Sequence, residues 1–94
     1  MPRPRDAPEP KFSLGRMVIT AGALATLNPE EVLTALCCHA RGDWGDVDPD
    51  DWQANERALG EDGRLVSVYR LSRRFYIITE WDRSLTTVLL PEEY

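Results

Sequence analysis

The residues best suited to chemistry in this 94-residue chain lie in one short segment near its C-terminus. Between Thr79 and Thr87 the chain carries Glu80, Asp82 and Arg83 among several hydroxyl side chains. A hairpin turn rarely needs so many polar groups, so this segment is the first candidate for a site. Arginine and threonine could stabilise the charge that develops on a phosphate, and a carboxylate or histidine could move protons.

One catalytic hypothesis combines His39, Glu80, Arg83 and Thr86 in a metal-free endoribonuclease of the barnase/RelE-like type. It requires His39 to reach the last hairpin across a helix–sheet interface. The simpler interpretation is structural: Arg83 pairs with Glu80 or Asp82, and His39 is a satisfied side chain on the apolar face of its helix. The negative net charge also disfavours RNA binding, because surfaces that bind RNA need cations.

A second candidate is the acidic middle of the chain. Residues 28–62 contain two basic and ten acidic residues, a net charge of −8 within a total of −5. Like charges packed this densely repel one another, and a partner with a basic groove would offset that repulsion. Tryptophan is a frequent interface anchor, so one tryptophan in this segment is included in the predicted surface. The predicted partner-binding residues are Asp43, Trp44, Asp46, Asp48, Asp50, Asp51 and Glu56.

No metal, cofactor or disulfide is predicted. The D-x-D-x-D run at 46–50 matches the start of a calcium loop, but Asp51 stands where that loop needs glycine and Arg57 where it needs glutamate. The Cys-Cys-His run at 37–39 lacks the ligand spacing of a zinc site. Adjacent cysteines do not readily bond to each other, so both are expected to be small buried side chains.

Length and composition predict a single soluble domain. The chain is 43 % apolar and 29 % charged, and no run approaches the ~18 apolar residues of a membrane span. Residues 1–11 include four prolines and lack the apolar stretch of a secretory signal. We therefore expect a disordered tail at 1–11, a domain at 12–94, and residence in the cytoplasm.

The sequence pattern predicts an α+β domain in which an antiparallel sheet of three to four strands packs against two helices. Asn28 and Asp48 each precede a proline, which is typical of helix starts, so helices should begin at residues 29 and 49. Strands are expected at 17–20, 65–71, 75–80 and 86–90, and the last three should form an antiparallel meander because their connections are short.

Several motifs resemble a family of small, largely uncharacterised bacterial proteins carried on plasmids, integrated elements and prophages. The motifs are F-x-L-G at 12–15, H-x-x-G-D-W-G at 39–45, and I-T-E-x-D-R-S-x-T-T-x-L-L-P-E-E-Y at 78–94. The resemblance covers about residues 12–94 and implies a mobile-element setting rather than an activity. Short acidic proteins of such elements include the anti-CRISPR proteins, among them inhibitors of type I systems.

The first functional hypothesis is therefore an anti-CRISPR-like inhibitor whose acidic face imitates DNA. It would block the basic DNA-binding groove of a host type I Cascade or another nucleic-acid-binding defence complex. It would act as a monomer in the bacterial cytoplasm, without binding DNA or a membrane, and charge reversal at Asp46, Asp48 and Asp50 would abolish inhibition. The ribonuclease is the alternative. A further option is a scaffold that holds an acidic partner on four arginines: Arg64, Arg70, Arg73 and Arg74.

Overall fold

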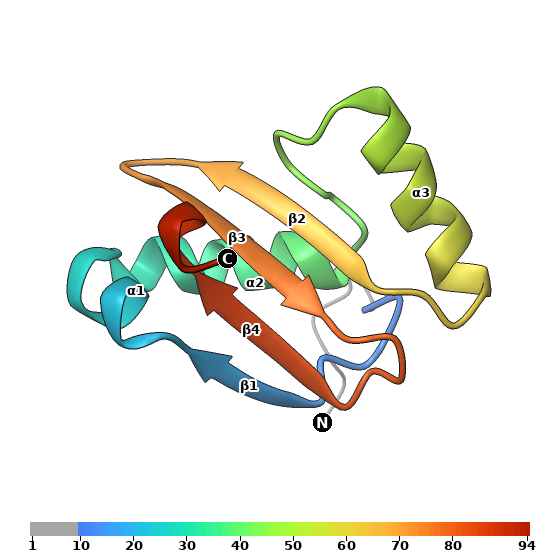
Figure 1. The fold of residues 1–94 in the computed structure, drawn as a ribbon, viewed down its shortest axis with the longest axis horizontal. Helices are drawn as coiled ribbons and strands as arrows, with labels where there is room; N and C mark the ends of the chain where they lie inside the picture. The colour runs from blue at the N-terminus through green and yellow to red at the C-terminus, as the bar shows by residue number, and fades with distance from the viewer. Residues whose placement is uncertain (1–9) are drawn as a thin grey trace, which may run out of the picture.

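The structure is a computed structural model that describes residues 10–94. It is the small α+β domain that the sequence predicts, with a four-stranded sheet and three α-helices in the described range (Figure 1). The elements are β1 (Arg16–Ile19), α1 (Ala21–Thr26), α2 (Pro29–Ala40), α3 (Pro49–Gly60), β2 (Leu65–Arg70), β3 (Arg74–Thr79), β4 (Leu85–Leu89) and the 3-10 helix η1 (Pro91–Glu93).

The strand order in the sheet is β1–β4–β3–β2. The last three strands form the predicted antiparallel meander, with Val66 opposite Ile78 and Ile78 opposite Thr87. The prediction of a wholly antiparallel sheet is wrong for the fourth strand, because β1 runs parallel to β4 with Arg16 opposite Leu85. Parallel neighbours need a long crossover, and here that crossover contains the three helices and two of the strands.

Both helix starts predicted from the sequence are confirmed. The side chain of Asn28 accepts a hydrogen bond from the Glu30 amide at 2.8 Å, and that of Asp48 accepts one from the Asp51 amide at 2.9 Å. A proline follows each cap at the first helical position, where the missing N–H would have had no partner. Local chemistry therefore sets where α2 and α3 begin.

Helix α2 lies across one face of the sheet and closes the main core (Figure 1). A smaller cluster joins Trp44, Ala58 and Leu65 where α3 approaches β2. The prediction that both cysteines are buried is wrong: Cys37 is exposed and Cys38 is half-buried. The main core consists of Ala23, Leu27, Val32, Ala35, Tyr69, Phe75, Ile77, Val88 and Leu90.

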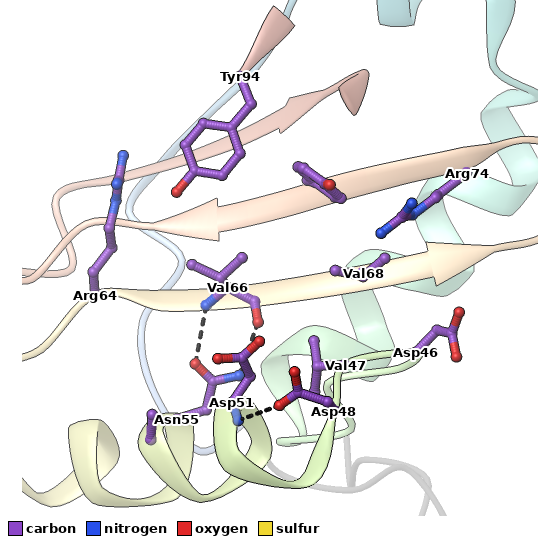
Figure 2. Close-up of a pocket in the computed structure, with 12 residues that line it drawn as sticks. Asp46, Val47, Asp48, Asp51, Asn55, Arg64, Val66, Val68, Arg74 and Tyr94 are labelled. Atoms are coloured by element: carbon purple, nitrogen blue, oxygen red, sulfur yellow. Dashed lines mark hydrogen bonds between the residues drawn. The ribbon is translucent and has the colours of Figure 1, made fainter. Parts of the chain in front are cut away.

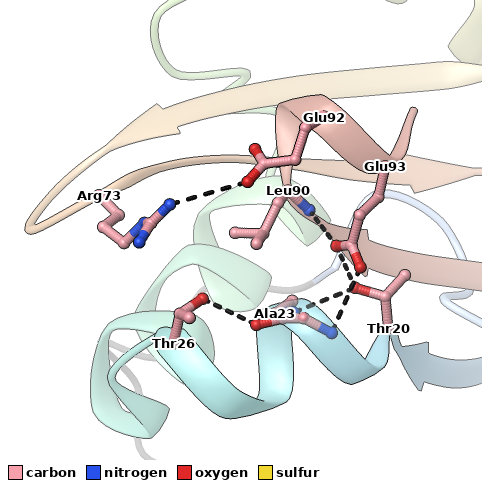
Figure 3. A network of polar contacts seen from close by, with 8 residues as sticks. Thr20, Ala23, Thr26, Arg73, Leu90, Glu92 and Glu93 are labelled. Carbon is pink, nitrogen blue, oxygen red and sulfur yellow. Dashed lines mark hydrogen bonds and ion pairs between the residues drawn. The ribbon is translucent and has the colours of Figure 1, made fainter.

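The C-terminal residues fold back onto the junction between β1 and α1 (Figure 3). Glu93 Oε1 accepts hydrogen bonds from Thr20 Oγ1 at 2.5 Å and from the Leu90 amide at 2.9 Å. Its Oε2 accepts one from the Gly22 amide at 3.3 Å. These bonds, the one from Thr20 above all, lower the pKa of Glu93. A single carboxylate thus links the last residues of the chain to the start of α1.

The predicted tail overlaps the described residues only at its end. Residues 1–9 lie outside the described part of the chain, whereas the Lys11 amide donates a hydrogen bond to the Ala40 carbonyl at 2.7 Å. Lys11 therefore belongs to the folded domain. Across residues 10–94, no helix is both long enough and apolar enough to cross a membrane.

Candidate functional site

A groove of about 500 Å³ lies on the sheet face that α2 leaves open (Figure 2). Side chains alternate between the faces of a strand, so Val66 and Val68 face this groove while Ser67 and Tyr69 face α2. One wall of the groove, called here the acidic wall, carries Asp46, Asp48 and Asp51 from the start of α3 and the segment before it. The opposite wall carries Arg64, Arg74, Tyr76 and Tyr94.

Arginine and tyrosine side chains on the second wall are held against one another. The Arg74 guanidinium lies 5.6 Å from the centre of the Tyr76 ring, and that of Arg64 lies 5.8 Å from the centre of the Tyr94 ring. The two tyrosine rings meet edge to face, with centroids 5.6 Å apart. Cation–π and aromatic contacts therefore preform this wall and occupy its cations.

The acidic wall is organised differently. Asp48 caps α3, and Asp50 and Asp51 lie in its first turn, where the helix macrodipole favours negative charge. Asp46 forms an ion pair with Arg70 at 3.5 Å. Within residues 10–94 no lysine or arginine pairs with Asp48, Asp50 or Asp51. Their carboxylates are therefore exposed and, among the described residues, are not neutralised by an ion pair.

Asn55 attaches the acidic wall to the sheet (Figure 2). Its Nδ2 donates to the Val66 carbonyl at 2.8 Å, and its Oδ1 accepts from the Val66 amide at 3.1 Å. The side-chain amide thus imitates a neighbouring strand, and the residue is 4 % exposed. The sequence analysis does not predict this role. The signal in the sequence is that Asn55 lies three residues before Ala58, which places both on one face of the helix, and the structure shows that this face is buried.

One of the predicted partner-binding residues is buried. Trp44 is 0 % exposed, so the prediction that it anchors a partner is wrong. Its Nε1 donates to Glu56 Oε2 at 2.8 Å, and Glu56 itself remains exposed. The turn is drawn inward because Gly45 packs on β2 so closely that a Cβ there would overlap the Val68 carbonyl. Asp43 serves this turn by accepting from the Gly45 amide at 3.2 Å.

His39 is the centre of a buried hydrogen-bond chain. Its Nδ1 lies 2.5 Å from Ser67 Oγ and its Nε2 lies 2.8 Å from Thr79 Oγ1. Thr79 Oγ1 lies 2.7 Å from Thr86 Oγ1, which donates to the Leu14 carbonyl at 2.6 Å. Because the Thr86 hydrogen goes to Leu14, Thr79 donates to Thr86 and accepts from His39. The neutral imidazole therefore carries its hydrogen on Nε2, and Nδ1 accepts from Ser67.

Burial, together with the nearby positive charge of Arg83, lowers the pKa of His39 to about 3. The rings of Phe12 and Trp44 lie at centroid distances of 5.3 Å and 5.6 Å from the imidazole. The side chain is 0 % exposed and both nitrogens are bonded. His39 is thus a neutral structural residue, as the simpler interpretation of the sequence predicts.

Arg83 joins the last hairpin to the end of α3. Its guanidinium donates to the carbonyls of Ala58 at 2.7 Å and of Gly63, rather than to the carboxylates predicted from the sequence. It also donates to the Glu80 carbonyl at 3.2 Å, while the Glu80 carboxylate pairs with Arg64 at 3.5 Å. Its backbone has a φ of 62°, a conformation that suits the tight turn.

The four residues of the ribonuclease hypothesis therefore do not share an accessible cavity. His39 and Thr86 are both 0 % exposed, and the guanidinium of Arg83 is occupied by carbonyl oxygens. This arrangement argues against a catalytic centre there, since two of the groups are buried, Arg83 is bound by carbonyls and the Glu80 carboxylate pairs with Arg64. Among the side chains of residues 10–94, no group of three or more His, Cys, Asp or Glu is placed to hold a metal ion.

Comparison of the chain with protein-family models, with curated proteins and with solved structures found no match.

Proposed function

We propose that this protein is a binding protein that presents its acidic wall, extended by Asp50, to a basic surface of a partner. The partner proposed is the DNA-binding groove of a host defence complex such as a type I Cascade, in the bacterial cytoplasm. Carboxylates that occupy such a groove would compete with the phosphates of DNA for the same cations. The mechanism is thus steric and electrostatic exclusion, without catalysis.

One observation carries this choice of face: within residues 10–94 the four arginines of the sheet have partners, whereas three carboxylates at the start of α3 form no ion pair. The arginine partners within the chain are Glu80 for Arg64, Asp46 for Arg70, Glu92 for Arg73 and the Tyr76 ring for Arg74. Among the described residues, Asp48, Asp50 and Asp51 pair with no cation. As far as residues 10–94 are concerned, an arriving basic surface therefore meets unneutralised charge on this wall, whereas an acidic partner of the arginines would have to displace existing contacts.

The rigidity of the wall also supports the proposal. The Asp48 cap and the two Asn55 hydrogen bonds fix the start of α3 against the sheet before any partner arrives. A preformed set of charges loses less conformational entropy on binding than a flexible acidic loop would. Its recognition should weaken as salt screens the carboxylates, because these side chains are exposed.

The test is a gel-shift competition in which the purified protein is added to a type I Cascade and its target DNA across a salt series. The site variant combines Asp46→Asn, Asp50→Asn and Asp51→Asn. It leaves Asp48 intact, because removing a helix cap costs about 1 kcal/mol and would confuse folding with binding. The matched control combines Glu61→Gln and Asp62→Asn, which remove exposed carboxylates at the far end of α3.

We expect the wild type and the control to displace DNA at low salt, and the site variant to have lost this ability while remaining folded. Failure of the wild type to displace DNA would contradict the proposed partner. Equal displacement by the site variant and the wild type would contradict the acidic wall as the contact surface.

A further inference from the structure

The two edges of the sheet differ in how their backbone groups are satisfied. At the β2 edge, Val66 is bonded by the Asn55 side chain. Val68 donates to the Trp44 carbonyl at 3.1 Å and accepts from the Asp46 amide at 2.6 Å. This edge is therefore closed to a further strand. Such covering is how proteins commonly protect an edge from unwanted pairing.

Among the described residues, nothing pairs with the outer edge of β1. The amides of Arg16 and Thr20 point inward, to the carbonyls of Ser84 at 2.9 Å and Val88 at 3.0 Å. Backbone groups alternate along a strand, so the N–H and C=O groups of Met17 and Ile19 point outward. No residue within 10–94 forms a hydrogen bond to either outward amide. β1 also lacks the proline or inward charge that protects many edge strands.

An apolar surface lies beside this open edge, on the face that α2 covers. Leu24 is 69 % exposed and Leu33 64 %, and Met17, on the same strand face as Ile19, is 57 % exposed. Ile19 joins Leu24 and Leu33 around a groove of about 270 Å³. A strand added to β1 would place its alternate side chains over this surface.

The charges near β1 favour a second copy of the same chain as the partner that would add a strand to this edge. In an antiparallel pair centred on Val18, Met17 of each copy lies opposite Ile19 of the other, so all four outward N–H groups find carbonyl partners. The same register places Arg16 of one copy opposite Thr20 of the other. Thr20 Oγ1 donates a hydrogen bond to the Glu93 carboxylate (Figure 3). In this register each Arg16 would therefore lie near the Glu93 of the other copy.

We propose that two copies of this chain associate through β1, in antiparallel register about a two-fold axis at Val18, and join their sheets into one. The contact is self-complementary: the hydrogen bonds, the apolar contacts and the Arg16–Glu93 attraction each occur twice. This departs from the monomer expected from the sequence. It is independent of the proposed function, because the acidic wall lies beyond the opposite edge of the sheet and stays open in the pair.

The experiment is sedimentation velocity over a dilution series from millimolar to low micromolar protein. Met17→Pro removes one outward N–H of β1, at a position whose amide does not hydrogen-bond to β4. Met17→Val keeps this N–H and is the matched control. Far-ultraviolet circular dichroism and the fluorescence of buried Trp44 report whether each variant is folded.

We expect the wild type and Met17→Val to form a concentration-dependent dimer, and Met17→Pro to remain monomeric. A second variant tests the charges without touching the strand backbone: Arg16→Glu should raise the dimer dissociation constant roughly tenfold at low salt, and Arg16→Lys should change it much less. A wild type that stays monomeric at every concentration overturns the proposal. So does a dimer that survives both Met17→Pro and Arg16→Glu unchanged.

Discussion

Acidification should destabilise this protein through its one histidine. His39 has an ordinary pKa of 6.5 when the chain is unfolded, and burial lowers the value to about 3 in the folded protein. Because the folded-state pKa is the lower one, the unfolded state binds more protons as the pH falls. The stability linked to His39 is therefore fully present above pH 6.5 and is lost progressively towards pH 3.

The magnitude follows from the same two values. Integrating proton binding from about pH 7 to about pH 4 gives a loss of roughly 3 kcal/mol. That is a large share of the roughly 5–15 kcal/mol that stabilises a typical domain. The lowered pKa values of Asp82 and Glu93 act in the same direction, but their contribution is lost only at lower pH, as the carboxylates themselves become protonated.

The assay is urea unfolding at a series of pH values, followed by the fluorescence of buried Trp44. The matched variant is His39→Gln, which keeps a polar group near Thr79 but does not titrate. The variant should be less stable at neutral pH by about 1–2 kcal/mol, because it loses the bond from Ser67. Its stability should then change little between pH 6.5 and the range where carboxylates titrate, while that of the wild type falls steeply.

A nuclear magnetic resonance titration of the His39 ring provides an independent check. The folded protein should show a neutral ring with its hydrogen on Nε2, unchanged from neutral pH down to the onset of unfolding. Equal pH slopes for the wild type and His39→Gln would refute the linkage. A ring that titrates near pH 6.5 within the folded protein would refute the burial argument itself.

Two substitutions test the contacts that position the candidate site. Asn55→Ala should lower the free energy of unfolding by about 2–3 kcal/mol, because it leaves the Val66 amide and carbonyl without their partner, whereas exposed Gln53→Ala on the same helix should change it by less than about 0.5 kcal/mol. Similar losses for the two variants would show that the Asn55 bonds contribute nothing. Arg83→Met should cost about 1–3 kcal/mol by urea unfolding and should also make the acid slope of His39 shallower, since the guanidinium charge lowers that pKa. An unchanged slope would contradict this coupling.

The elements that could be predicted are those whose signals are local. The Asn28 and Asp48 caps act within three residues, so the starts of α2 and α3 follow from neighbouring side chains. The meander could be predicted for the same reason, since strands joined by short turns pair with their neighbours. The parallel pairing of β1 with β4 depends on how three helices pack, and no short segment of the sequence encodes it.

The candidate site was harder to predict because its contacts join distant parts of the chain. Trp44 stands among aspartates in the sequence, yet it is buried because the Gly45 backbone approaches β2 closely. The role of Asn55 depends on how α3 packs along β2, because its side-chain amide must lie opposite the backbone of Val66. Side-chain type and spacing indicate what a residue can do, but the packing of separate elements decides whether it meets water or protein.

The most conspicuous polar residues of this chain are therefore structural, and this changes where function should be sought. His39, Thr79 and Thr86 satisfy one another inside the fold, and Arg83 binds the carbonyls that end α3. Buried polar groups are costly unless every one finds a partner, which explains why so specific a set of residue types is needed there. Within residues 10–94, the fold leaves open an acidic wall and an unpaired strand edge, which lie at opposite edges of the sheet. Both are surfaces suited to binding, and neither requires the polar cluster to be accessible.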